Sequence, residues 1–129
     1  MQPMIDRVGS ARAWQQAGRQ GPPVDLYETA QAVVIRLAIP GAEGSSLSLS
    51  VGEDSVTVSG ESGMPGSDWA ERTVVHWQEI PYGRFRRVVP LPAPVEARGV
   101  RAQFRNGVLD ITLPKAGRVQ SRTIPITFQ

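Results

Sequence analysis

The strongest constraint on the fold of this chain is a short run of strictly alternating residues, SLSLSV, at positions 46–51. In an extended chain the two leucines and the valine point to one side and the three serines to the other, which predicts a strand with one buried face. After the turn GED, the segment SVTVSG repeats the alternation with Val56 and Val58. The two segments are therefore expected to pair as a β-hairpin.

Short β-branched segments continue through most of the chain. A second hairpin is predicted around Asn106-Gly107, because this dipeptide supplies the positive-φ residues that a tight turn between strands requires. The segments read as strands, besides the first hairpin, are VDLYET (24–29), AVVIRLAIP (32–40), TVVHWQ (73–78), RFRRVVPL (84–91), VRAQF (100–104) and VLDITL (108–113). The pattern thus gives about eight short strands and no convincing interior helix.

The even spacing of these strands favours an all-β fold, a two-sheet β-sandwich. The residues of the second hairpin expected to face its core are Val100, Ala102, Phe104, Leu109, Ile111 and Leu113. We divide the chain into a short N-terminal arm (1–22), a folded domain (23–115) and a C-terminal extension (116–129).

The C-terminal extension carries an unusual apolar pair, Ile124 and Ile126, with Pro125 between them. Residues two apart on an extended chain point to the same side, and the proline restricts the local backbone. The three residues therefore form a stiff, two-pronged plug. A final strand of the same domain is one interpretation, but the polar, glycine-containing linker KAGRVQSR favours a detachable segment.

Composition narrows the possible partners. The 129 residues carry a formal net charge of +2, and the densest basic group is Arg84, Arg86 and Arg87, so no nucleic-acid partner is expected. There is no cysteine, which excludes disulfides and thiolate metal sites. No segment is long and apolar enough for a secretory signal or a membrane span, so we expect a cytoplasmic protein without a membrane partner.

Candidate catalytic residues are scarce. His76 is the sole histidine and lies in an apolar segment without a second histidine or a cysteine to share a metal. No serine lies in a nucleophile-elbow motif, and no glycine-rich loop has the lysine that a phosphate site needs. We therefore predict no catalytic, cofactor-binding or metal-binding residues, and no enzyme.

Four segments in order resemble the small heat-shock proteins of the α-crystallin domain family, in their bacterial and plant form. PPVDLYETAQAVVIRLAIPG is similar to the opening P-x-x-D-I-x-E and later L-P-G of that domain. PYGRFRRVVPLP resembles G-x-F-x-R-x-x-x-L-P, and ARGVRAQFRNGVLDITLPK contains A-x-x-x-N-G-V-L. The residues Ile124, Pro125 and Ile126 match the C-terminal I-x-I motif.

The resemblance implies an immunoglobulin-like sandwich that acts as an ATP-independent holdase for partly unfolded client proteins. It also implies a homodimer in which TVVHWQ pairs with the partner's sheet, while assembly beyond the dimer stays open. The residues that it places at the dimer interface are Val74, Val75, His76, Trp77 and Arg87. For Arg87, a solvated strand arginine is the alternative.

Exposed sheet edges recruit other strands unless they are covered, so the tail is expected to fill a groove between two edge strands, in the same or a neighbouring chain. The predicted groove residues are Leu47, Leu49, Val100, Ala102 and Phe104. The predicted client-binding residues of the arm are Met4, Ile5, Val8 and Trp14. A co-chaperone-type adaptor for one folded partner is the alternative function, and a carbohydrate-binding or enzymatic sandwich is a more distant one.

Overall fold

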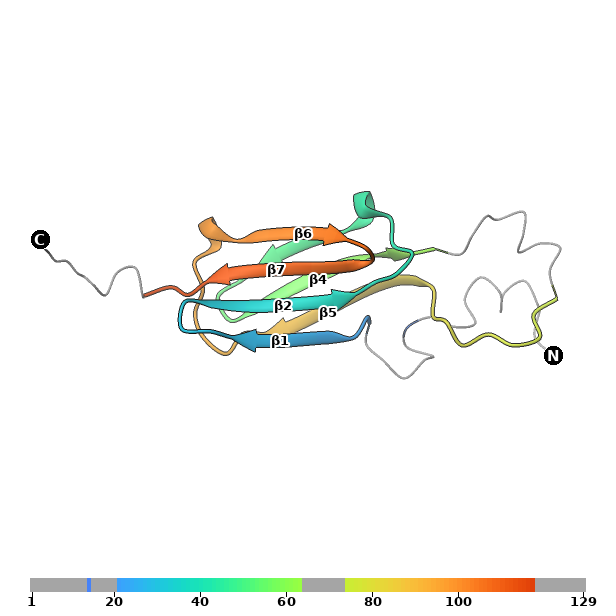
Figure 1. Ribbon diagram of the computed structural model, residues 1–129, viewed down its shortest axis with the longest axis horizontal. Coiled ribbons are helices and arrows are strands. Elements are labelled where there is room, and N and C mark those ends of the chain that lie inside the picture. Colours follow the sequence, from blue (N-terminus) through green and yellow to red (C-terminus); the bar gives the residue numbers. More distant parts are fainter. Residues whose placement is uncertain (1–13, 15–20, 64–73, 118–129) are drawn as a thin grey trace, which may run out of the picture.

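A computed structural model describes Trp14, residues 21–63 and residues 74–117 of the chain. The arm residues Met4, Ile5 and Val8 and the tail residues Ile124, Pro125 and Ile126 lie outside the described residues. The described part forms two antiparallel sheets packed face to face (Figure 1). The predicted all-β, immunoglobulin-like two-sheet sandwich is confirmed.

The first sheet has the strand order β1-β2-β7-β6 and the second has the order β3-β4-β5. The strands are β1 (Val24–Glu28), β2 (Ala32–Ala38), β3 (Ser48–Val51), β4 (Ser55–Ser62), β5 (Gly83–Pro90), β6 (Arg101–Arg105) and β7 (Val108–Pro114). Two single turns of 3₁₀-helix, η1 (Gly44–Ser46) and η2 (Ala97–Gly99), precede β3 and β6.

Both predicted hairpins form. In the β3–β4 hairpin, Leu49 lies opposite Val58, so the alternation read from the sequence sets the register. In the β6–β7 hairpin, Asn106 and Gly107 have φ angles of 55° and 76°, as a tight turn requires. A side chain at Gly107 would also meet the Pro40 backbone, because an added Cβ would lie 3.2 Å from the Pro40 Cα atom.

The core lies between the two sheets and consists of the inward-facing alternate residues of four strands, with Ile39. Its buried hydrophobic residues are Trp14, Val33, Ile35, Leu37, Ile39, Val56, Val58, Phe85, Val89, Leu109, Ile111 and Leu113. At about 1.5–3 kcal/mol for each fully buried large apolar side chain, this set supplies the main driving force for folding. The inward orientation predicted for the three β7 residues is confirmed.

Trp14 is the one member of this core that comes from the N-terminal arm. Its side chain is 4% exposed, and its ring meets the ring of Phe85 edge-on at a centroid distance of 6.2 Å. We predicted this tryptophan on an arm that contacts clients, and the structure instead packs it inside the sandwich. Its indole N–H has no hydrogen-bond partner among the described residues, so this packing leaves a polar group unsatisfied.

The segment predicted as the strand TVVHWQ is the other difference. Its described residues, Val74–Gln78, form no strand within the single chain. Figure 1 shows this part of the chain running beyond the ends of the two sheets. A segment without a neighbouring strand in its own chain makes no ladder there, so the expected pairing of this segment with a partner's sheet stays a prediction.

Candidate assembly surfaces at the sheet edges

Two open sheets leave four edge strands, β1 and β6 in one sheet and β3 and β5 in the other. The β3 and β6 edges belong together, because an added Cβ at Gly44, just before β3, would lie 3.8 Å from the Phe104 ring on β6. The β1 and β5 edges also lie together. Gly21, just before β1, packs against β5, because a Cβ added at Gly21 would contact the Arg87 and Phe85 side chains. The sandwich therefore has two rims, each made of one edge strand from each sheet.

The rim formed by β3 and β6 carries a strip of apolar side chains that are half-buried or exposed, which we call the β3–β6 strip: Leu47, Leu49, Val100, Ala102 and Phe104. Four of them, all except Ala102, pack against the core and remain partly accessible. The sequence prediction therefore named residues that the fold brings to one rim.

Ala102 is exposed, although the sequence placed it facing the core. It lies opposite Ile111 in the β6–β7 pair, and Ile111 is fully buried, so Ala102 shares the inner face of its sheet. Ala102 stays accessible because β6 is an edge strand and because the alanine side chain is short. The inward direction predicted for Ala102 agrees with this pairing, and its accessibility follows from the open edge of β6.

Packing near η1 fixes one end of this strip. The Cδ2 atom of Leu47 packs so close to Gly60 in β4 that a Cβ added there would be 2.6 Å away, and a larger residue would displace the Leu47 side chain. The Ser46 hydroxyl donates a hydrogen bond to the Glu43 carbonyl (2.8 Å) and accepts one from the Glu61 N–H (3.1 Å). These contacts hold the start of β3 against β4, so the strip has a defined backbone.

The β1 edge is open in the described part of the chain, since β1 pairs only with β2 there. Leu26 and Tyr27, in the middle of this strand, are exposed. An exposed edge with unpaired backbone groups is a template for another strand. The sequence pattern marked this segment as a strand but gave no sign that it would lie at an edge.

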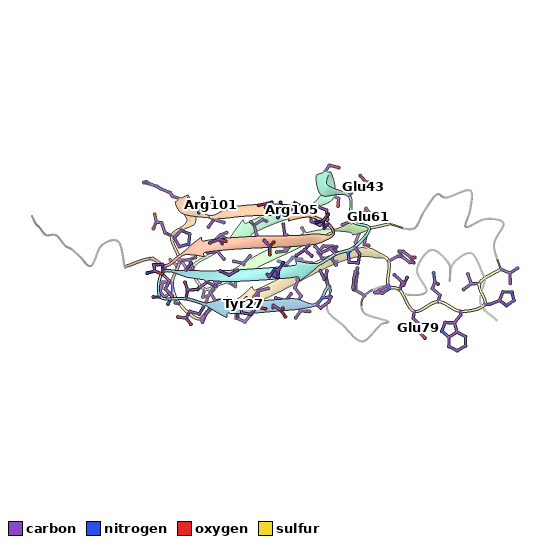
Figure 2. The ribbon with its side chains drawn as sticks, viewed as in Figure 1. Tyr27, Glu43, Glu61, Glu79, Arg101 and Arg105 are labelled. Atoms are coloured by element: carbon purple, nitrogen blue, oxygen red, sulfur yellow. The ribbon has the colours of Figure 1, made fainter. Side chains whose placement is uncertain are left out.

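Large apolar side chains also protrude from the segment before β5. Val74, Trp77 and Ile80 are exposed, Trp77 by 83% of its surface, and Val75 is half-buried. His76 is exposed as well, and the Trp77 indole donates a hydrogen bond to the Glu79 carboxylate at 2.7 Å. Glu79 marks the place of this segment in Figure 2. Exposed aromatic and aliphatic side chains gathered in one segment are typical of an interaction site.

Arg87 lies on β5, next to the end of the N-terminal arm. Its side chain is partly buried against Gly21, and its guanidinium donates a hydrogen bond to the Pro22 carbonyl at 3.4 Å. It is therefore not the fully solvated arginine of the alternative interpretation. Within one chain, Arg87 therefore holds the end of the N-terminal arm against β5.

The outer face of the first sheet is polar and ion-paired. Arg36 on β2 pairs with Asp110 on β7, and this hydrogen-bonded partner raises the pKa of the guanidinium. The Tyr27 hydroxyl donates to the Asp25 carboxylate at 3.0 Å, and this hydrogen bond to the carboxylate raises the pKa of Tyr27 above its ordinary value. The polar and charged side chains of this face suit contact with solvent, whereas exposed apolar side chains gather at the β3–β6 strip and on the segment before β5.

Among the residues that the structure describes, no three His, Cys, Asp or Glu side chains gather where they could hold a metal ion. Within the same residues, no helix is long and apolar enough to cross a membrane.

The comparisons with known proteins agree on the class. Residues 25–127 match the family described as Hsp20/alpha crystallin. The chain is 34% identical over 115 residues to spore protein SP21 of Stigmatella aurantiaca, covering 85% of this chain and 67% of that one. Heat shock protein 16.0 of Schizosaccharomyces pombe has the same fold, with a TM-score of 0.69 at 27% identity, covering 84% of this chain and 98% of that one.

A small heat-shock protein of Xylella fastidiosa, described as having a distinct high order structure, is also similar. Its TM-score is 0.65 at 28% identity, with 84% of this chain and 94% of that one covered. The fold, its open rims and these relatives define a chaperone of the small heat-shock type. The chain belongs to the Hsp20/alpha crystallin family. Members of this family are ATP-independent chaperones that form homo-oligomers, and they are not enzymes.

Proposed function

We propose that this protein is a cytoplasmic holdase, which binds partly unfolded proteins and prevents their aggregation without nucleotide. The observation that carries the proposal is the placement of partly exposed apolar side chains along the β3–β6 strip, beside fully sealed core positions. A surface that is apolar and only partly covered can contact the apolar segments that an unfolding protein exposes.

The building block in this proposal is a homodimer made by strand exchange. The segment Val74–Gln78 is rich in β-branched and aromatic residues and forms no strand in its own chain, while β1 offers an open edge. Addition of this segment to β1 of a partner would satisfy backbone groups on both chains. Val74, Val75, His76 and Trp77 would then lie in the dimer interface, with Arg87 near it.

The tail supplies a second contact, in which Ile124 and Ile126 fill the β3–β6 strip of a neighbouring chain. Two isoleucines contribute about 3–6 kcal/mol before the cost of association is subtracted, so one tail alone binds weakly. A dimer carries two tails, and linked weak contacts hold an assembly together while still allowing exchange. A reversible cover over an apolar strip suits a chaperone, because clients can reach the strip when the tail leaves.

The arm residues Met4, Ile5 and Val8 are proposed as additional client contacts.

The test is aggregation of a heat-labile client, followed by light scattering with no nucleotide present. The intact chain should suppress scattering at about one dimer per client, and an equal mass of an unrelated folded protein serves as the control. No suppression at stoichiometric excess would reject the holdase. A single complex of fixed stoichiometry with one folded partner, in place of suppression, would support the adaptor.

A further inference from the structure

The root of the C-terminal extension is fastened to the sandwich from two sides. The Lys115 N–H donates to the Gln31 carbonyl in the β1–β2 turn at 2.9 Å. On the other side, the Ala116 N–H donates to the Pro94 carbonyl at 2.9 Å, and Pro114 accepts from the Glu96 N–H at 2.7 Å. The backbone is therefore fixed as far as residue 116, at the end of the sandwich where β7 and β1 both finish (Figure 1).

A side-chain contact joins the same root to the edge strand. The Lys115 ammonium lies 2.7 Å from the Glu28 carboxylate, and the two side chains are 17% and 44% exposed. Glu28 is the last residue of β1, and Lys115 is the only lysine in the chain. A partly buried ion pair is screened less by salt than a fully exposed one, so this contact can hold a defined geometry.

Gly117 follows directly and has a φ of 86°, a conformation that favours glycine. The chain thus turns at Ala116 and Gly117, the two residues that follow Lys115. Whatever fixes the position of Lys115 therefore also fixes the point from which the extension continues. This starting point matters because the proposed docking of Ile124 and Ile126 must reach the strip of a neighbouring chain.

We infer that Lys115 is a positioning residue for assembly: its ion pair with Glu28 clasps the root of the tail to the β1 edge strand. This inference rests on the proposed function, since it needs both a docked tail and a partnered β1 edge. The clasp links these two contacts, so loosening it should weaken tail docking without removing either isoleucine.

The experiment measures subunit exchange of the full-length chain by native mass spectrometry, after mixing unlabelled and ¹⁵N-labelled protein. The variants are Lys115→Glu, Glu28→Lys and the double swap, with Lys115→Arg as the charge-conserving control. We expect about two- to fivefold faster exchange in the two single variants, the range that partly exposed ion pairs support. The double swap and Lys115→Arg should return to the rate of the unchanged protein.

A matched control separates assembly from general stability. Asp110→Lys breaks the other ion pair of the same sheet, between two half-exposed side chains on its outer face, and should leave exchange unchanged. Single variants of the clasp that exchange at the original rate, or a double swap that fails to restore it, would overturn the inference.

A chain truncated after Arg122 distinguishes this failure from that of tail docking. If truncation lowers the oligomer mass while the clasp variants change nothing, tail docking stands and the clasp is wrong. If truncation leaves both mass and exchange unchanged, tail docking is wrong and the clasp is overturned with it.

Discussion

The interior of this sandwich and its rims are built from the same kinds of residue but are covered to different degrees. In the interior, Ile35 and Ile111 have neighbouring strands on both sides and are fully buried. At the rim, Leu49 and Ala102 point to the same side as the buried residues opposite them, yet they remain accessible because their strands have only one neighbour. Position in the sheet order, more than residue type, decides what is available for assembly.

One strand pattern can serve two purposes in this sandwich. Alternation of apolar and polar residues specifies an inner face for every strand. At an edge, only an added segment, from the same chain or from another, can complete that face. The proposed partner strand and tail are such additions, so changes to the interior should affect folding and changes at the rims should affect association.

The largest difference in unfolding free energy is expected between two tryptophan variants, one at buried Trp14 and one at exposed Trp77. Trp14→Ala should lower the free energy of unfolding by about 3–5 kcal/mol, because it leaves a cavity beside Phe85. Trp77→Ala should change it by less than about 0.5 kcal/mol, since that side chain is exposed, but should weaken dimerisation. Urea unfolding and analytical ultracentrifugation measure the two quantities. A stable Trp14→Ala variant would place the arm outside the folded unit.

The buried position of Trp14 also shows where prediction from the sequence fails. The arm has no apolar periodicity that pairs Trp14 with a strand, so nothing local indicates that it enters the core. By contrast, the β3–β4 register follows from strict alternation, and the β6–β7 turn follows from Asn106-Gly107. Strand pairing and turns between neighbouring segments can be predicted from the sequence. The contact between Trp14 and Phe85 cannot, because it depends on how segments far apart in the sequence pack together.

The candidate site was predictable to a similar extent. The residues of the β3–β6 strip could be named because each lies on an amphipathic strand, and the family resemblance indicated which strands are edges. The exposure of Ala102 and the ion pair between Lys115 and Glu28 could not be predicted. Both depend on which strands lack a neighbour and on where loops meet, and neither leaves a mark in a single sequence.

A second pair of variants compares an apolar side chain in the interior with one at the rim. Ile111→Ala should cost about 2–5 kcal/mol of unfolding free energy, since the site is fully enclosed. Leu49→Ala at the rim should cost less than about 1.5 kcal/mol, because its side chain is only half-buried. Thermal unfolding of both variants checks the ratio. Equal losses would mean that the rim is sealed as tightly as the interior.

The polar face of the sheet should contribute little. Asp110→Asn removes the ion pair with Arg36, and both side chains are about half exposed to solvent, so we expect only a slight loss of unfolding free energy. The loss should shrink in high salt because exposed charges are screened. Urea unfolding at two ionic strengths measures it, and a loss that grows with salt would contradict this explanation.

The smallest effect should appear at alkaline pH. The pKa of Tyr27 is raised by its hydrogen bond to Asp25, so folding favours the protonated phenol. The resulting stability is fully present below the ordinary value of 10.0 and is lost as the pH rises through the higher folded-state pKa. Tyr27→Phe should remove this alkaline decline and, because it also removes the hydrogen bond to Asp25, should lower stability slightly at neutral pH. An identical pH profile in both proteins would exclude the assignment to Tyr27.

The most direct test of the account is hydrogen–deuterium exchange of the intact chain and of a chain ending at Arg122, compared strand by strand. Amides of β2 and β7 should stay equally protected in both chains, while those of β3 and β6 should exchange faster once the tail is gone. Equal protection of β3 and β6 in the two chains would contradict the claim that the rims are covered by other segments.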